Sequence, residues 1–285
     1  MKTIIGVVIA AVCIFGGYVL SNGKLLALYQ PFEFMIIAGG AFGGFIIANP
    51  GVVIKDVFKE LPGLLKGPKY KKQDYMDLLS LMFALFTKAR KEGLMSLEGD
   101  VDEPEESEIF NSYPKVKGNH HALEFITDYL RLMVGGSMNP FELENLMDLE
   151  LETHEKESHE PSAAVVTVAE GLPGFGIVAA VMGVVITMGH MDEPPEVLGH
   201  HIAAALVGTF LGILLCYAFV GPFGHAMEAR AKEDSKYLEV IKTCIMATLN
   251  GYTPQVAVEF GRKALPSHVR PGFLELEEHV KQAKR

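Results

Sequence analysis

The sequence predicts an all-α protein with four transmembrane helices and a helical cytoplasmic region, which is formed by the link between the second and third spans together with the C-terminal tail. Three observations support this fold class. Four long stretches are apolar and nearly free of charge, the charged residues gather between and after them, and no segment shows the pattern of a strand. Of the 285 residues, 49% are hydrophobic and 21% are charged. These averages alone do not predict membrane spans, so the prediction depends on where the charged residues lie along the chain.

The first two stretches cover residues 3–23 and 34–54, and neither contains Asp, Glu, Lys or Arg. Each has 21 residues, so as a helix each would be about 31 Å long. That length matches a hydrocarbon core about 30 Å thick. Lys2 precedes the first stretch as in a secretory signal, but the apolar core is too long and no convincing cleavage site follows before Lys24. We therefore expect residues 3–23 to be retained as a span.

The third and fourth stretches cover residues 163–191, interrupted only by Glu170, and residues 199–223, which contain no Asp, Glu, Lys or Arg. Only helices and closed barrels satisfy every backbone polar group inside lipid, and the stretches lack the alternation of barrel strands. The sequence therefore predicts four transmembrane helices.

The lysines indicate the orientation of these spans. Six of them follow the second span directly: Lys55, Lys59, Lys66, Lys69, Lys71 and Lys72. The link 191–198 carries Asp and Glu but no Lys or Arg. Because cytoplasmic loops are rich in Lys and Arg, we expect residues from 55 onward and both termini in the cytoplasm. The predicted domains are residues 1–54 (spans one and two), 55–162 (cytoplasmic segment), 163–223 (spans three and four) and 224–285 (cytoplasmic tail).

The cytoplasmic region is predicted to be helical and acidic. Apolar residues recur at helical spacing in 74–91 and 122–134, and Asn139-Pro140 is typical of the cap and first turn of another helix. In the tail we expect helices over residues 225–249, 254–264 and 272–284. The charge run 100–108 is interpreted as a solvated linker.

No pattern of catalytic or cofactor-binding residues stands out. A net charge of -10 excludes a broad basic face for nucleic acid. Cys13, Cys216 and Cys244 have neither metal-ligand nor disulfide-framework spacing. His154 and His159 are five residues apart, so they leave the single helix face that a zinc site needs, and we interpret them as surface residues. Phosphate-loop, nucleophile-elbow and dinucleotide patterns are missing, so we expect neither an enzyme nor a cofactor.

The most informative segment is the third span around Pro173, which is followed by Gly174 and Gly176. A proline inside a helix removes a backbone hydrogen bond and costs about 3 kcal/mol unless its neighbours compensate. The glycines make a helix that can flex and approach other helices closely, although an ordinary packing kink would give the same pattern. Pro222, at the inner end of the fourth span, is a second such point.

The spans contain no carboxylate deep inside them, since Glu33 and Glu170 lie near span ends. Towards the middle or beyond, the polar side chains are Thr187, Thr209 and Tyr217. Ion passage through lipid generally needs titratable or coordinating groups inside the bundle. If this protein conducts an ion, a partner must supply the carboxylate.

Two motifs resemble the A subunit of the flagellar motor stator, the MotA/PomA family. Residues 173–181, with the sequence PGFGIVAAV, together with Pro222 match the family's two prolines. Residues 88–98, with the sequence KARKEGLMSLE, match its charged cytoplasmic motif. The resemblance covers essentially the whole chain, with two spans, a long cytoplasmic segment, two more spans and a charged tail.

The resemblance implies a bacterial inner-membrane ion channel that works with a MotB-type single-span subunit and drives flagellar rotation. It implies five A subunits around two B helices, with the third and fourth A helices facing a B-subunit aspartate that carries the ion. By the same resemblance, Arg90 and Glu98 would contact a FliG-type switch protein of the rotor. Pro173 and Pro222 would couple ion passage to movement of the cytoplasmic region.

The transported ion is expected to be a proton. Sodium-driven relatives have Thr at the position of Ala180 and a Thr pair where Gly208-Thr209 stands, so in this chain Thr209 alone keeps its hydroxyl. Two alternatives remain from the sequence. One is an energy-coupling protein of the ExbB/TolQ type, which usually has three spans. The other is a non-conducting membrane scaffold, against which Pro173 among glycines argues.

Overall fold

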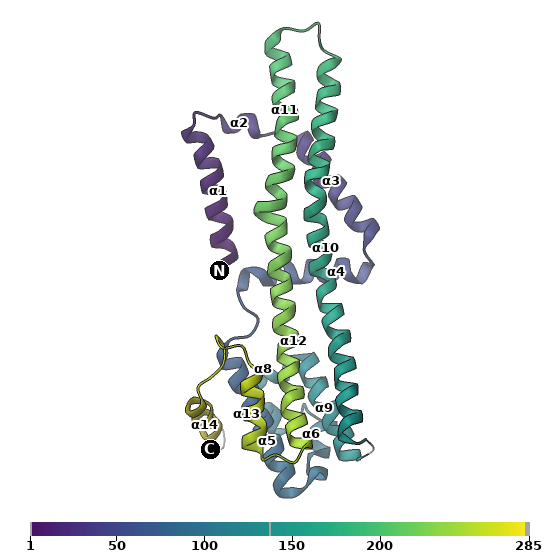
Figure 1. Ribbon diagram of the computed structural model, residues 1–285, viewed down its shortest axis with the longest axis vertical. Coiled ribbons are helices and arrows are strands. Elements are labelled where there is room, and N and C mark those ends of the chain that lie inside the picture. Colours follow the sequence, from purple (N-terminus) through teal and green to yellow (C-terminus); the bar gives the residue numbers. More distant parts are fainter. Residues whose placement is uncertain (1, 137, 283–285) are drawn as a thin grey trace. The chain divides into compact units, whose positions relative to one another are not determined.

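The computed structural model describes residues 2–136 and 138–282, and every regular element in these ranges is helical (Figure 1). Four helical runs are long and apolar enough to cross a membrane: Lys2–Leu20, Leu25–Ala48, Pro140–Met188 and Pro195–Leu249. The all-α prediction and the four predicted spans are therefore confirmed. The chain is a multi-pass membrane protein.

The chain divides into two compact units, which we call the span unit and the polar unit. The span unit comprises Met1–Gly67 and Glu157–Ala231, and the polar unit comprises Pro68–Lys156 and Lys232–Arg285. The domain limits predicted from the onset of charge, at 54/55, 162/163 and 223/224, describe where the chain leaves the membrane and stay predictions, because the compact units divide the chain by its internal contacts.

The span unit begins with short and long helices in alternation. These are α1 (Lys2–Leu20), α2 (Leu25–Leu28), α3 (Pro31–Ala48), α4 (Gly51–Glu60) and the 3-10 helix η1 (Leu61–Lys66). Its other part comes from the later residues of α10 (Pro140–Met188), from α11 (Pro195–Leu214), from a π-helical turn (Leu215–Val220) and from the first residues of α12 (Gly221–Leu249).

The second span is shorter than the predicted helix over 34–54. Helix α3 ends at Ala48, Asn49 is extended (φ -120°, ψ 142°), and α4 begins at Gly51. Pro50 disfavours a helical conformation at the residue before it and lacks an N–H for the helix. The side-chain amide of Asn49 donates to the Phe45 carbonyl oxygen at 2.8 Å, which occupies one acceptor at the helix end. The prediction of one helix through residue 54 is wrong.

The third and fourth spans are longer than predicted. The helix expected from Asn139-Pro140 and the span 163–191 form the single helix α10, with Pro161 and Pro173 inside it. The fourth span likewise passes through the π turn into α12, so the tail helix does not begin at His225 as predicted. Pro222 is the second residue of α12, which directly follows the π turn, so the N–H that it lacks falls at the junction between the two helical forms.

The polar unit is a bundle of helices around one apolar core. Its elements are α5 (Lys72–Glu92), η2 (Leu94–Leu97), α6 (Glu98–Asp102), α7 (Glu108–Asn111), α8 (Pro114–Lys117), α9 (His120–Gly135), the start of α10, the end of α12, α13 (Pro254–Ala264) and α14 (Phe273–Gln282). Helix α5 is the centre of this core, because Leu78, Leu79 and Leu85 are completely buried. The helices predicted over 74–91, 122–134 and 254–264 are confirmed.

The charge run 100–108 is not a solvated linker throughout. The Asp100 side chain is buried, pairs with the Lys88 ammonium at 2.6 Å and accepts a hydrogen bond from the Ser107 hydroxyl at 2.5 Å. Ser107 in turn caps α7 by accepting from the Phe110 N–H. The interpretation holds for Glu105, whose side chain is 77% exposed, and is wrong for Asp100. The composition of residues 100–108 shows that the segment is charged, but it does not show that the Asp100 carboxylate is buried.

A second charge pair lies within α13, and its buried arginine also binds the segment before α14. Arg262 is 7% exposed, and its guanidinium donates to both Glu259 carboxylate oxygens at 2.6 Å and to the Pro271 carbonyl oxygen at 2.9 Å. These hydrogen bonds lower the pKa of the Glu259 carboxyl below its usual value. A carboxyl group with a depressed pKa stabilises the folded state only while it is ionised.

We therefore expect Glu259→Gln to unfold more easily than the parent chain at pH 7. The difference should disappear as the pH falls below about 4.3, the ordinary glutamate pKa, and through the lower folded-state pKa. Thermal unfolding of both proteins in detergent between pH 7 and pH 3 measures this difference. A difference that stays constant over the whole range would contradict the linkage.

Candidate functional site

The span unit is organised by a contact between the backbones of α10 and α11, which lie side by side in Figure 1. A Cβ atom added to Gly212 would lie 2.6 Å from the Leu172 carbonyl oxygen. One added to Gly176 would lie 3.0 Å from the Gly208 carbonyl oxygen. Because glycine alone permits such an approach, these residues set the separation of the two helices.

The structure brings the two predicted ion-pathway positions, Ala180 and Thr209, to this same contact. A Cβ atom on Gly208 would lie 3.4 Å from the Ala180 nitrogen, and one on Gly176 would lie 3.4 Å from the Thr209 Cα. Ala180 and Thr209 are themselves half-buried. Their proximity could not be derived from the sequence, since it depends on the register between the two helices.

Pro173 lies in the middle of the contact region of α10, next to Leu172, which is 3% exposed. The ring of Phe175, two residues on, packs against α3 at Gly40, where a Cβ atom would come within 2.5 Å of it. The neighbouring residues Gly39 and Gly40 of α3 thus differ in their surroundings. Gly40 accepts the Phe175 ring, whereas an added Cβ at Gly39 meets nothing within 4 Å.

Pro222 follows a feature that sequence analysis missed, the π-helical turn Leu215–Val220. At its end the Gly221 N–H donates to the carbonyl oxygen of Cys216, five residues earlier. A π turn inserts one extra residue into a helix and is frequent at functional sites. No periodic pattern in the sequence signals it, because the whole span is apolar.

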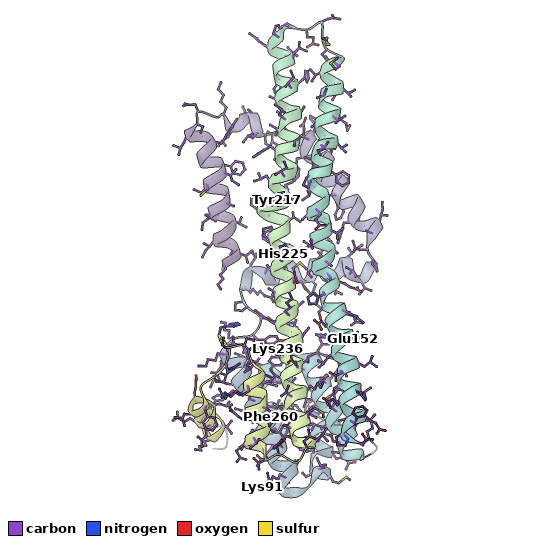
Figure 2. All side chains as sticks on the ribbon, viewed as in Figure 1. Lys91, Glu152, Tyr217, His225, Lys236 and Phe260 are labelled. Atoms are coloured by element: carbon purple, nitrogen blue, oxygen red, sulfur yellow. The ribbon has the colours of Figure 1, made fainter. Side chains whose placement is uncertain are left out.

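The polar groups of the spans are few and lie where they were expected. Glu33 lies in the first turn of α3. Glu170 lies 18 residues before the end of α10 at Met188, which is about 27 Å along the helix. The Thr187 hydroxyl donates to the Gly183 carbonyl oxygen at 2.8 Å, and Tyr217 on the π turn is 74% exposed (Figure 2). The α10–α11 contact itself is therefore uncharged.

Large apolar side chains remain exposed on the span unit. Helix α1 has no buried residue within the chain. The exposed apolar residues of α10 include Ile177, Val181, Val185 and Met188. Such faces suit contact with lipid or with other membrane helices.

The second candidate site lies in the polar unit and contains Arg90 and Glu98. Arg90 is in the last turn of α5, and Glu98 is the first residue of α6. Both side chains are exposed, and neither forms an ion pair with a residue in the described part of the chain. Exposed charges of this kind contribute little to folding, so they are available to a partner.

Lys88 and Arg90 belong to one sequence motif but have different surroundings. The Lys88 ammonium is bound to the buried Asp100, whereas Arg90 points to solvent at the end of α5. The sequence motif alone does not show that Lys88 is paired and Arg90 is not. Within the described ranges, no group of three or more His, Cys, Asp or Glu side chains is arranged to hold a metal ion.

Comparison with known proteins identifies the family. Residues 4–93 match the model described as Motility protein A N-terminal, and residues 118–240 match the MotA/TolQ/ExbB proton channel family. Motility protein A of Escherichia coli (strain K12) is 50% identical over 284 residues, which cover 100% of this chain and 96% of that protein. The chain belongs to the motility protein A family. The resemblance found in the sequence is confirmed, and its function is that of a flagellar motor stator subunit in a proton channel family.

Other relatives agree with this family. Chemotaxis protein LafT of Vibrio parahaemolyticus is 41% identical and covers 97% of each chain. The flagellar MotAB stator complex from Bacillus subtilis contains a chain with a TM-score of 0.75 and 27% identity, covering 95% of this chain and 98% of that one. A chain in the structure of C. jejuni MotAB has the same fold, with a TM-score of 0.77, 23% identity and coverage of 93% and 96%.

The N-terminal match also decides between the family and the ExbB/TolQ alternative. The second family model covers MotA, TolQ and ExbB together, but the first describes motility protein A alone. The four membrane-spanning helices agree with this assignment, since ExbB and TolQ proteins usually have three.

Proposed function

We propose that this motility protein A works with a MotB-type single-span subunit as an ion channel that converts ion-motive force into torque on the rotor switch complex. The observation that carries the proposal is the tight and uncharged contact between α10 and α11 around Pro173. Proton pathways through a membrane are generally marked by ionisable side chains, and this contact contains none. A carboxylate on the partner helix supplies the missing group, and the relatives of known structure are MotAB complexes.

The transported ion is a proton. At the contact, Ala180 has no hydroxyl and Gly208 has no side chain, so Thr209 is the one hydroxyl at these positions. Sodium needs several oxygen ligands once it leaves water, whereas a proton needs a single acceptor.

We expect swimming speed to be independent of external sodium when the proton-motive force is held fixed. Tracking cells whose sole stator contains this subunit, in media that exchange sodium for potassium, measures the dependence. Speed that follows the sodium concentration would contradict proton transport.

Pro173 and Pro222 couple ion passage to movement of the polar unit. One elementary charge crossing the membrane supplies about 2.3 kcal/mol per 100 mV. That is comparable to one or two net hydrogen bonds of about 1 kcal/mol each. A helix already lacking a hydrogen bond at its prolines is a suitable place for a change of this size.

Arg90 and Glu98 engage the rotor, a FliG-type switch protein, through complementary charges. The support for this contact is that both charges are exposed and unpaired within the described part of the chain. Charges on an interface rim contribute mainly to orientation and rate of association.

We expect Arg90→Glu to abolish swimming while leaving membrane insertion and folding intact, because the exposed side chain contributes little to stability. Motility plates and membrane fractionation measure the two properties. The control is Lys156→Glu, the same type of charge reversal at an exposed position on α10. Normal swimming of the Arg90→Glu cells would remove the rotor contact from the proposal.

The complex contains five copies of this subunit around two B-type helices in the bacterial inner membrane, with both termini in the cytoplasm. The exposed apolar faces of α1 and α10 support an assembly with further helices. The lysines that follow the second span support the orientation. Native mass spectrometry of the complex tests the composition, and protease access in inside-out vesicles tests the orientation.

A further inference from the structure

Helix α4 and the 3-10 helix η1, which we call the α4–η1 segment, pack one face against the span unit. Val53, Val57 and Leu64 are buried and belong to one apolar cluster with Phe45 of α3 and Met227 of α12. Phe45 lies in the last turn of α3. The α4–η1 segment therefore lies beside the end of the second span, and does not extend away from it.

Two further contacts fix the segment at the ends of the spans. The hydroxyl of Thr3, in the first turn of α1, donates to the Leu64 carbonyl oxygen at 3.2 Å. The Arg230 guanidinium donates to the carbonyl oxygens of Gly63 and Gly67 at 2.8 and 2.6 Å. Figure 1 shows α4 lying across the direction of α1, near the start of that helix. Because the start of α1 and the end of α3 are the same-side ends of two spans, the segment lies at the boundary between lipid and water.

The opposite face of the segment exposes large apolar side chains. Val52 is 70% exposed and Phe58 is 56% exposed, and Leu61 and Leu65 of η1 are also exposed. They continue the exposed apolar surface at the end of α3, where Ile47 is 88% exposed. Apolar side chains that remain uncovered directly after a span are typical of a helix that lies in the membrane interface.

Three lysines accompany this apolar face. Lys55, Lys59 and Lys66 are exposed, and none of them forms an ion pair with a residue in the described part of the chain. Around α4, Lys55 lies about 60° from Phe58 and Lys59 about 100° from it. Long lysine side chains keep their methylene groups on apolar surface while the ammonium group reaches the polar layer. The lysines thus lie where lipid headgroups meet the apolar face.

The acidic residues of α4 do not share this position. Asp56 and Glu60 are half-buried, whereas the lysines are exposed. Glu60 belongs to the face that packs on the span unit, since it lies about 20° from Val53 around the helix. The charge that the segment presents outward is therefore positive.

We propose that the α4–η1 segment is a binding site for the headgroups of anionic phospholipids. The side chains of Val52 and Phe58 enter the surface of the bilayer, and the ammonium groups of Lys55, Lys59 and Lys66 bind the lipid phosphates. The phosphatidylglycerol headgroup has a net negative charge that phosphatidylcholine lacks, so the lysines favour the former. The inference does not depend on the proposed channel function.

The test uses a tryptophan as a reporter of lipid contact, because the chain has no tryptophan of its own. The full chain carrying Phe58→Trp is placed in vesicles of equal parts phosphatidylcholine and phosphatidylglycerol. One of the two lipids carries bromine atoms on its acyl chains, which quench tryptophan fluorescence on contact. Phe141→Trp, at a 71% exposed position of the polar unit, is the control for the reporter.

We expect both brominated lipids to quench Phe58→Trp, brominated phosphatidylglycerol more strongly, and neither to quench Phe141→Trp. Adding Lys59→Gln to the Phe58→Trp chain should lower the preference for phosphatidylglycerol about fivefold. Lys24→Gln is the matched control, since Lys24 is exposed and follows the other end of α1, and it should leave the preference unchanged. All variants are compared at equal helix content by circular dichroism.

Three outcomes would overturn the lipid site. Absence of quenching of Phe58→Trp by either lipid would mean that protein, such as a second copy of this chain, covers the segment. Equal quenching by the two lipids would show an apolar contact without headgroup binding. A preference that disappears when inorganic phosphate is added would assign the lysines to free phosphate. Equal effects of Lys59→Gln and Lys24→Gln would likewise contradict a site on α4.

Discussion

Gly212→Leu is expected to force α10 and α11 apart and to abolish ion flow through the assembled complex. The first atom of any side chain at this position would lie 2.6 Å from the Leu172 carbonyl oxygen and 2.9 Å from the Gly176 Cα. Both are backbone atoms, so no side-chain rotation relieves the clash. Overpacking of this kind costs about 3 kcal/mol, and here it also changes the separation of the helices around Ala180 and Thr209.

The measurement is twofold. Unfolding in mixed detergent reports the stability of the chain, and proton flux into vesicles reports the complex with its B-type subunit. Gly6→Leu is the control, because a Cβ atom at Gly6 in α1 meets nothing within 4 Å. A Gly212→Leu complex with normal flux would show that the close contact is dispensable for conduction.

Lys88→Ala is expected to be the most destabilising change in the charged motif. It would leave the buried Asp100 carboxylate without its cation, which costs about 3 kcal/mol. Arg90→Ala, two residues away, is expected to change stability by less than about 0.5 kcal/mol, because its side chain is exposed and unpaired within the described ranges. The two substitutions thus separate folding from rotor contact.

Thermal unfolding and swimming speed distinguish the two cases. Lys88→Ala should lower both, while Arg90→Ala should lower swimming speed alone. Lys88→Ala with Asp100→Asn should recover part of the lost stability, since the uncompensated charge is then removed. Equal unfolding temperatures for Lys88→Ala and Arg90→Ala would contradict a structural role for the Lys88–Asp100 pair.

The spans and the main helices of the polar unit could be predicted because their causes are local. An uncharged run of suitable length has few alternatives to a helix in lipid, and the spacing of Leu78, Leu79 and Leu85 marks one buried face of α5. The ends were harder to predict. Pro50 ends a helix, whereas Pro173 lies inside one, and the local sequence does not distinguish the two cases.

The sequence identified the residues of the candidate sites, but it did not show which other residues surround them in the folded chain. The sequence motif put Arg90 and Lys88 together, and burial of Asp100 separated them. The approach of α13 to Arg90 had no sequence signal, because Thr253 and Gln255 are far from it along the chain. The neighbours of Ala180 likewise follow from the register of two helices, which composition and periodicity do not determine.

The π turn fixes the helical register of the residues that follow it in the fourth span. Gly208, Gly212 and Cys216 are buried at intervals of four residues, whereas Gly221, where an added Cβ atom would lie 3.8 Å from the Ala169 Cβ, comes five residues after Cys216. The fourth span therefore consists of two helical segments whose registers are offset by one residue at the π turn. Deleting one residue there would rotate everything beyond it by about 100° and turn Gly224 away from Val166. Chain length at this point is constrained more tightly than residue identity, so single-residue insertions or deletions should be rarer in evolution than substitutions.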